Sequence, residues 1–331
     1  MKQGMSEKTK IRKLLSSLME SYSIYLVLAG LVLISIILTD SFTDSQNITN
    51  IVRQISISTM IAFGAMILII AGMIDLSAGS VLALAGVLGV MVFVETQSIF
   101  LAIIVSVLVG LLCGLIDGLV ITKLKVPSFI ATMAMQTIAR GAVKLMTDAV
   151  PIYQIGDLSQ IGKGYFLSIP IPVWAMMGVA LITWVLLNRT RFGRYIYAIG
   201  GNQDAAIAAG VNINLVKIGA NVINGIFTGF AGIMLMARLN GGLPLAGVGY
   251  EFEAITAAVI GGTSIAGGVG KVAGTIAGAL IMGILSNILN LLTVQAYLQE
   301  VIKGVIIIIA VAADIVQKEH RERTRKKAHD M

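Results

Sequence analysis

The chain has 331 residues, of which 57% are hydrophobic and 12% are charged, and its mean hydropathy is +0.92. These values exclude a soluble globular domain and predict an all-α integral membrane protein with several spans. The formal net charge is +7, but Lys and Arg gather mostly in the two tails and one central loop, which is the charge pattern of membrane topology. We therefore expect membrane lipid, and no nucleic acid, as a partner of this chain.

The N-terminal segment, residues 1–21, is hydrophilic and basic and is predicted to be a cytoplasmic tail. The apolar stretch at 22–39 is long enough to cross the hydrocarbon core of a bilayer. It lacks the short core and small-residue cleavage site of a signal peptide, so we expect an uncleaved first span. Nine further apolar stretches follow, at 51–71, 79–94, 99–122, 128–147, 171–188, 214–237, 253–267, 272–293 and 300–316. The chain is thus predicted to form one transmembrane domain of about ten helices over 22–316, followed by a charged cytoplasmic tail at 317–331.

The distribution of charge supports ten spans, because that number puts the basic loops on the side of the N-terminus. The inner side then holds Lys123, Lys125, Arg189, Arg191, Arg194, Lys271 and the C-terminal tail. The outer side is mainly acidic, with Asp40, Asp44, Glu95, Asp148, Asp157, Glu251 and Glu253 against Lys163 and Arg238. Polar or Gly-rich interruptions at 75–80 and 261–270 predict broken or re-entrant backbone in spans three and eight, which must be buried in protein or face water.

Several glycines recur every four residues, which leaves one helix face without side chains. The series are Gly110, Gly114 and Gly118, then Gly225 and Gly229, then Gly270, Gly274 and Gly278. Such faces let two helix backbones approach closely. We expect them to be packing faces and not ligand sites.

Residues suited to catalysis or metal binding are scarce. Cys113 is the only cysteine and lies in an apolar stretch, while His320 and His329 lie in the charged tail. The stretch 268–273 has the GxGxxA spacing of a dinucleotide site, but it joins two apolar stretches and follows no strand of a soluble unit. We predict no catalytic residue, no metal site and no cofactor in this chain.

Carboxylates that could couple transport to an ion gradient are poorly placed. A secondary carrier usually needs such a group near the middle of the membrane. Asp75 is expected in a cytoplasmic interruption, and Asp314 ends the last span. Asp117 is expected about 10 Å from the centre of its span, toward the cytoplasm. The sequence therefore offers no obvious internal energy source.

The longest internal polar stretch with a basic cluster, 189–213, lies between two apolar spans. Within it, Asn202 can cap a short helix over 203–209, and Gly210 can supply the left-handed residue that stops it. The helix would present Ala205, Ala206, Ile207 and Ala209. This surface could fit a groove on a soluble partner, or the stretch could be an ordinary capped loop helix.

The stretch at 128–147 carries a polar residue at every fourth position: Ser128, Thr132, Gln136, Arg140 and Lys144. Steps of four turn a helix by about 400°, so these side chains stay on one broad face. We predict that this face lines a transport path, with a second polar face formed by Asn221, Asn224 and Thr228. The alternative is hydrogen bonding between helices, with the two cations reaching to the outer surface.

Three motifs, GMIDLSAGS at 72–80, TRFGRYIYAIGGN at 190–202 and GYEFEAITAAVIGGTSIAGG at 249–268, resemble the membrane permeases of ribose-type sugar ABC importers. The similarity covers essentially the whole chain, in order. The segment 204–210 also looks like the EAA loop of importer permeases, with Asp204 in place of Glu, although the downstream part of that pattern is missing.

The resemblance implies a permease that imports a ribose-like monosaccharide across the bacterial cytoplasmic (inner) membrane, with a type II importer fold of ten helices in two inverted halves. Its partners would be a second permease copy in a homodimer, an extracytoplasmic sugar-binding protein, and cytoplasmic ATPase subunits that hold ATP and Mg. The ATPase would dock on the loop 189–213, through Asn202, Asp204, Ala205, Ala206, Ile207 and Gly210. The outer carboxylates, especially Asp148, Asp157, Glu251 and Glu253, could pair with the binding protein or could simply reflect charge-sorted topology.

Other functions stay open at this point. An importer of the same type could carry a nucleoside or a signalling sugar, and a secondary carrier or channel could move another small polar solute. A membrane-bound enzyme is a third class. Transport assays with and without ATP separate an importer from a carrier.

Overall fold

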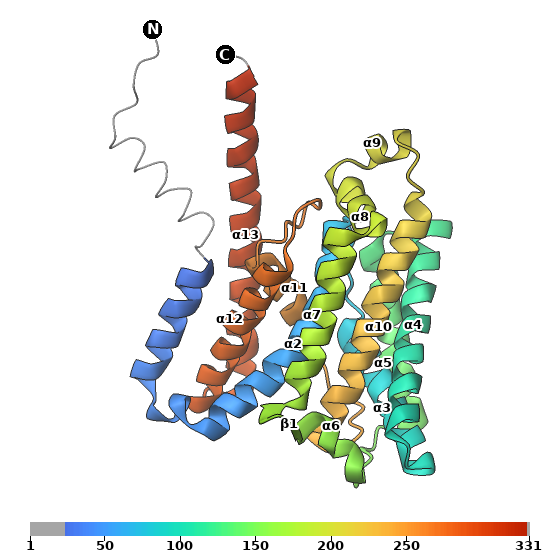
Figure 1. Ribbon diagram of the computed structural model, residues 1–331, viewed down its shortest axis with the longest axis vertical. Coiled ribbons are helices and arrows are strands. Elements are labelled where there is room, and N and C mark those ends of the chain that lie inside the picture. The colour runs from blue at the N-terminus through green and yellow to red at the C-terminus, as the bar shows by residue number, and fades with distance from the viewer. Residues whose placement is uncertain (1–23, 330–331) are drawn as a thin grey trace.

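The computed structural model describes residues 24–329 (Figure 1), so the tail predicted at 1–21 lies outside the described residues. The first helix is Ile24–Leu38. The elements after it are η1 (Asp40–Thr43), α2 (Ser45–Ile70), α3 (Ala78–Thr96), α4 (Ile99–Lys123), α5 (Ser128–Thr147), η2 (Gly156–Leu158), α6 (Ser159–Lys163), β1 (Tyr165–Phe166), β2 (Ile169–Pro170), α7 (Ile171–Arg189), α8 (Arg191–Gly201), α9 (Gln203–Ala208), α10 (Ile213–Leu239), α11 (Tyr250–Ile260), α12 (Val272–Leu291) and α13 (Ala296–His329). The fold is all-helical apart from the short antiparallel hairpin of β1 and β2.

Each of the ten predicted spans contains a helix at its position. Among the described residues, six helices are long and apolar enough to cross a membrane, namely α2, α3, α4, α7, α10 and α12. The chain is therefore a multi-pass membrane protein. The helices at the other four predicted spans are shorter or more polar. The shortest of them, α11, ends at Ile260 because two glycines follow, and Gly262 has a φ of +86° that side chains disfavour.

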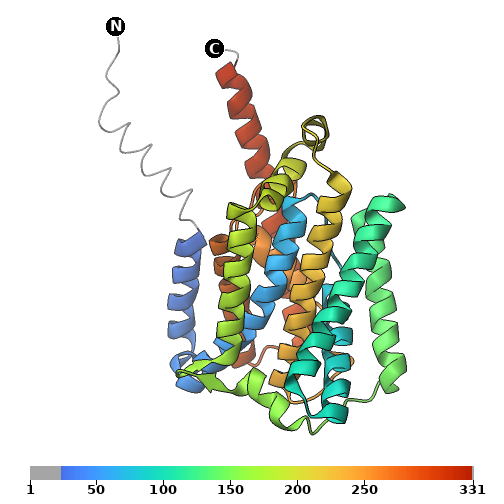
Figure 2. The ribbon, with the colours of Figure 1, turned by 45° about the vertical axis from the view of Figure 1, so that its right-hand side comes forward.

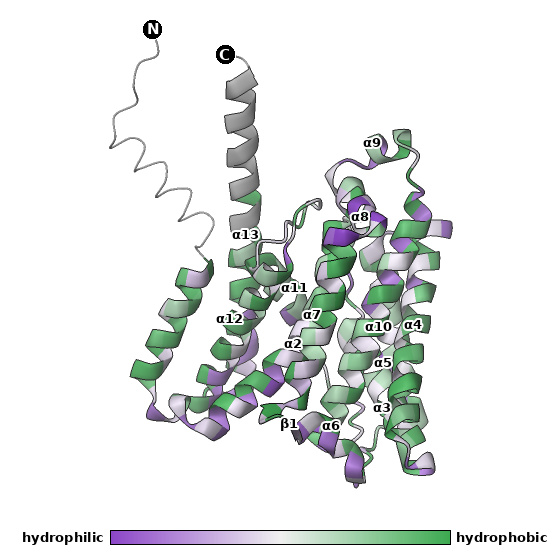
Figure 3. Cartoon of the chain, viewed as in Figure 1, coloured by the Kyte–Doolittle hydropathy of each residue, from purple (hydrophilic) through white to green (hydrophobic). Residues whose placement is uncertain are grey.

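The central helix of the bundle is α2, which crosses the molecule diagonally (Figure 1). It packs against α7, α10, α11 and α12, and its last four turns are almost continuously buried. In contrast, α4 and α7 are mostly exposed and carry apolar side chains on their outer faces (Figure 3). Apolar surface of this kind suits contact with lipid.

The helix pair with the most extensive contact is α4 with α10, and their glycine faces pack against each other. A Cβ atom added at Gly110 would lie 2.1 Å from the carbonyl oxygen of Gly225, and one added at Gly229 would lie 2.3 Å from that of Ser106. On the other side of the bundle, Gly274 of α12 meets the carbonyl of Gly261 in the same way. The prediction that the glycine series are packing faces is confirmed, and the partner helix belongs to the same chain.

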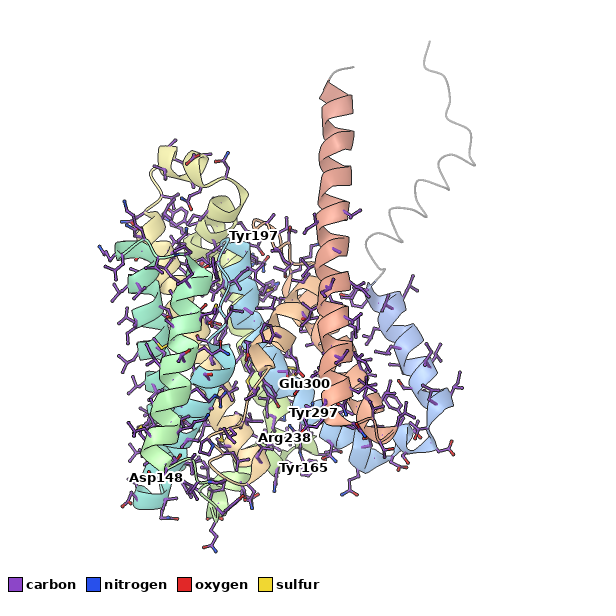
Figure 4. All side chains as sticks on the ribbon, turned by 180° about the vertical axis from the view of Figure 1, so that it is seen from behind. Asp148, Tyr165, Tyr197, Arg238, Tyr297 and Glu300 are labelled. Atoms are coloured by element: carbon purple, nitrogen blue, oxygen red, sulfur yellow. The ribbon has the colours of Figure 1, made fainter. Side chains whose placement is uncertain are left out.

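The two ends of the bundle differ in what they carry. The start of Ile24–Leu38, the pair α8 and α9, and the far end of α13 lie at one end (Figures 1 and 2). The hairpin, α6 and the loop before them lie at the opposite end. Seen from behind, Tyr197 of α8 marks the first end, while Asp148, Tyr165 and Arg238 mark the second (Figure 4). This arrangement agrees with the alternation of loops that the charge pattern predicts.

Candidate functional site

The connection between α2 and α3, residues 71–77, is non-helical backbone inside the bundle, and we call it the linker. Gly72 allows the chain to turn after α2, since its φ is +75°. Two amides of the linker find acceptors on α5: Ile74 N donates to Ser128 Oγ at 3.2 Å, and Leu76 N donates to Thr132 Oγ1 at 3.1 Å. Broken backbone is present as predicted, but it lies before α3 and not within it, since α3 is one continuous helix over Ala78–Thr96. Side chains of a neighbouring helix satisfy the linker's polar groups, as a membrane interior requires.

Asp75, in the linker, lies deep in the bundle and is only 5% exposed. Its Oδ2 accepts a hydrogen bond from Asn224 Nδ2 at 2.6 Å, and its Oδ1 accepts from both the amide and the hydroxyl of Ser77 at 2.6 Å. Because Asn224 lies close to the middle of α10, the expectation that Asp75 belongs to a cytoplasmic interruption is wrong. The linker folds back into the bundle before α3 begins.

The polar stripe of α5 faces the rest of the chain at three of its five positions. Besides the contacts of Ser128 and Thr132 with the linker, Arg140 donates to the carbonyl oxygens of Pro244 and Ala246 at 2.7 and 2.9 Å. It also reaches the start of α3, through Gly79 O and Ser80 Oγ, both at 3.3 Å. Arg140 therefore joins α5, α3 and the loop after α10.

Gln136 and Lys144 behave differently from the rest of the stripe. Gln136 is half-buried, and its amide makes no hydrogen bond within the described part of the chain. Lys144 is exposed. Gln136 and Lys144 are thus the stripe residues whose polar groups have no partner among the described residues, and Gln136 is the half-buried one.

The second predicted polar face, on α10, also meets the linker. Asn221 Nδ2 donates to the carbonyl of Lys217 at 2.8 Å and lies 3.6 Å from Met73 Sδ, while Asn224 holds Asp75. Thr228, one turn further on, is buried. The structure therefore brings both predicted polar faces together around the linker.

A cavity of about 400 Å³ lies beside the linker at the end of the bundle that carries α9. Its polar lining comes from five elements: Thr122 of α4, Lys125 of the following loop, Ser128 of α5, Gln203 of α9, and Asn214 and Lys217 of α10. Lys217 Nζ donates to Gln203 Oε1 at 2.9 Å. The cavity therefore adjoins both the linker and the polar stretch 189–213.

The polar stretch 189–213 contains two helices where the sequence predicts one. The predicted helix is confirmed as α9, since Asn202 Oδ1 accepts from the amide of Ala205 at 2.9 Å and Gly210 has a φ of +78°. Before it, α8 begins after Thr190, whose hydroxyl accepts from the amide of Gly193 at 3.1 Å. A threonine directly before the helix is a capping signal, and it could have revealed α8 in the sequence.

The surface of α9 differs from the predicted one at a single position. Ile207 is 55% exposed, and Asp204, Ala205 and Ala209 are exposed with it. Ala206 is buried and packs into the main core, so it cannot touch a partner. Its assignment to the contact surface is wrong, because packing against neighbouring residues, and not helix capping, decides which face of so short a helix points inward.

Helix α8 touches the end of α2 and the Gly-rich loop at 261–271. A Cβ atom at Gly200 would lie 1.7 Å from the carbonyl oxygen of Ile70 and 2.4 Å from the amide nitrogen of Gly268. Tyr197 donates its hydroxyl to the carbonyl of Gly270 at 2.8 Å, and burial raises the pKa of Tyr197 above its ordinary value. Helix α8 therefore packs directly against the end of α2 and against that loop.

At the opposite end, two of the four predicted docking carboxylates have partners inside the chain. Glu251 is 3% exposed and faces Gly79, and Glu253 forms an ion pair with Lys303 at 2.5 Å. Of the two alternatives left open for Glu251 and Glu253, pairing with a soluble protein does not fit, because α11 turns Glu251 into the bundle and Glu253 toward α13. Asp148 and Asp157 are exposed.

Comparison with known proteins identifies the family of the chain. Residues 47–311 match the family described as branched-chain amino acid transport system / permease component. The chain belongs to this permease family. A ribose import permease protein of Bacillus subtilis (strain 168) is 46% identical over 299 residues, which cover 89% of this chain and 93% of that protein. The ribose import permease protein of Escherichia coli (strain K12) is 40% identical over 304 residues, or 90% and 94% of the two chains.

A permease for another sugar is also similar. The L-arabinose transport system permease protein of Escherichia coli (strain K12) is 38% identical over 297 residues, which cover 89% of this chain and 90% of that protein. No solved structure has a significant match to the chain. As the permease component of a transport system, the chain is not itself an enzyme and carries no cofactor.

Proposed function

We propose that the chain is the membrane-spanning permease of an ATP-driven importer that moves ribose, or a closely related monosaccharide, from a binding protein into the cytoplasm. The order of similarity carries this proposal, since relatives named for ribose import are 46% and 40% identical and one named for L-arabinose is 38% identical. Amide and hydroxyl groups gather around the linker, among them Asn221, Asn224, Ser128 and Thr132, and such uncharged polar groups suit a sugar path.

Transport by the assembled importer tests this function. The permease is reconstituted in liposomes with its ATPase and binding protein, and uptake of radiolabelled ribose is followed with ATP or with a non-hydrolysable analogue. We expect uptake only with ATP, and weaker competition by arabinose than by unlabelled ribose. Uptake that follows a sodium or proton gradient without ATP would identify a secondary carrier, and competition by a branched-chain amino acid or a nucleoside would reassign the substrate.

We propose that the loop 189–213 is the seat of the ATPase and lies in the cytoplasm with both termini. The support is geometric: α8 and α9 project from one end of the bundle (Figure 1), and α8 contacts the end of α2 and the loop at 261–271. A partner that moves this segment therefore moves parts that adjoin the linker. The transmembrane domain would be the single unit 22–316, with ten spans in the type II importer arrangement.

We propose that the transport path runs along α5 and is completed by a second permease copy. Helix α5 packs on α3 and α4 and stands at an edge of the bundle (Figure 2). Its free polar group, Gln136, would line the path. The other predicted path residues would act indirectly, by holding the linker and the neighbouring loop in place. They are Ser128, Thr132, Arg140, Asn221 and Asn224.

Cysteine labelling tests this path. With Cys113 replaced by alanine, Gln136→Cys is expected to react with small water-soluble thiol reagents and to be protected in one nucleotide state. Ala139→Cys, at a buried position of the same helix, is the control and should stay unreactive. If Gln136→Cys is unreactive in every nucleotide state, the path lies elsewhere.

A further inference from the structure

A second, much smaller cavity lies between the linker, α3, α4 and α10. Its volume is about 10 Å³, which is close to the least space that holds one water molecule and so suits one small ion. It is lined by Asp75, Ser77, Val81, Gly114, Asp117, Asn224, Gly225 and Thr228.

Two of the lining residues are carboxylates in a nearly dry place. Asp75 is 5% exposed and Asp117 is 4% exposed, and none of the lining residues is basic. Two carboxylates in a medium of low dielectric repel each other, and each loses its hydration. A positive charge in the cavity would reduce both the repulsion between the carboxylates and the cost of their lost hydration. A single neutral water molecule would not cancel the repulsion.

The two carboxylates are unequally compensated by the protein. Asp75 accepts three hydrogen bonds, and it lies two residues before Ser77, the residue that caps the positive N-terminal end of α3. Asp117 of α4 accepts no hydrogen bond from any residue that the structure describes. Asp117 is therefore the less compensated of the two carboxyl groups, on the side of α4.

An unused oxygen ligand completes the site. Thr228 is 1% exposed and lines the cavity, and its Oγ1 has no hydrogen-bond partner among the described residues. A buried hydroxyl without a partner loses free energy unless something binds it. Its lone pairs are available to a cation that sits between the carboxylates.

We propose that this cavity binds one monovalent cation of the size of sodium, held by the carboxylates of Asp75 and Asp117 and by the hydroxyl of Thr228. Oxygen ligands suit a hard cation, and the volume leaves no room for the water that Mg²⁺ keeps around it. Within the described residues, no cluster of three or more His, Cys, Asp or Glu side chains could hold a metal ion, which sets this site apart from a transition-metal centre. The ion would tie the linker to α4 and α10, where the sequence predicts no metal site.

Direct binding tests the proposal independently of transport. The full-length permease is purified in detergent, and binding of radioactive sodium and the melting temperature are measured in sodium, potassium and choline chloride at equal ionic strength. We expect one sodium ion per chain and a higher melting temperature in sodium than in choline. Asp117→Asn is expected to weaken sodium binding at least tenfold and to abolish the sodium-dependent shift, while Glu95→Gln, at an exposed carboxylate, should keep both.

Thr228→Val tests the site if Asp117→Asn fails to fold, because valine has nearly the same shape as threonine but lacks its hydroxyl. Loss of sodium binding in folded Thr228→Val supports the site. Equal melting temperatures of the native chain in sodium and choline would show that the cavity holds water or that Asp117 carries a proton, and would overturn the proposal. Undiminished sodium binding by both variants would overturn it as well.

Discussion

Single glycines decide how closely α4 and α10 approach, and they are the least replaceable residues of the bundle. At Gly225 the opposing atom is a backbone carbonyl oxygen of Gly110, which cannot rotate away as a side chain can. At Gly178, on the outer face of α7, nothing lies within 4 Å of an added Cβ. The two positions therefore differ in how closely neighbouring atoms approach an added methyl group, whereas the change in helix propensity from glycine to alanine is the same at both.

Gly225→Ala is expected to destabilise the bundle by about 1–3 kcal/mol or more, because an added methyl group must push two backbones apart. Gly178→Ala, the matched control, is expected to raise stability slightly, since alanine favours a helix by about 1 kcal/mol over glycine. Melting temperatures of the two variants in the same detergent provide the measurement. Equal melting temperatures would show that the helices separate without cost.

At the scale of elements, the linker is held in place by groups of other helices. Its amides at Ile74 and Leu76 have no helical partner and depend on the hydroxyls of α5. Replacing Thr132 by valine keeps the shape of the side chain but leaves the amide of Leu76 without an acceptor in an apolar place. The helix α5 itself is unaffected, so the variant reports on the linker.

Thr132→Val is expected to cost about 1–3 kcal/mol of stability, the usual penalty for a buried amide that loses its acceptor. Thr137→Val on the same helix is the control, because the hydroxyl of Thr137 is exposed and binds only the carbonyl of Met133. Amide hydrogen exchange at 71–77 should accelerate in the first variant alone. Unchanged exchange would mean that the linker has another support.

The second element with a separable role is α9, whose exposed side is proposed to meet the ATPase. Ile207→Asp would place a charge in that contact, and we expect the loss of several kcal/mol of binding free energy, seen as failure of the ATPase to co-purify. Leu245→Asp, at a comparably exposed position at the other end of the bundle, should leave co-purification intact. Retention of the ATPase by a folded Ile207→Asp variant would remove α9 from the contact.

At the scale of the whole molecule, a single copy of the chain has α5 at its edge, and this helix exposes apolar side chains together with a polar one. Helix α5 exposes Phe129, Ile130, Met133 and Ile138 beside the half-buried amide of Gln136. Lipid satisfies the apolar side chains but not the amide. A second copy with α5 facing α5 would cover both, and it would enclose the path between two equivalent walls.

Native mass spectrometry of the detergent-solubilised importer should therefore show two permease chains of 34.9 kDa together with two ATPase subunits. A disulfide between two copies of Gln136→Cys, on a background without Cys113, would place α5 at the contact. A complex with one permease chain, and no second permease of another sequence, would contradict the homodimer.

The sequence by itself determined the membrane class, the positions of the helices in the ten predicted spans and the capped helix α9, because hydropathy, glycine spacing and helix capping are properties of neighbouring residues. Tertiary structure decided everything that joins distant residues. Asp75 meets Asn224 across 149 positions of sequence, and this contact places Asp75 inside the bundle and not in a cytoplasmic interruption. The inward direction of Ala206 and Glu251 was settled in the same way, since a short helix turns toward the neighbours that bury it, and those neighbours come from remote parts of the chain.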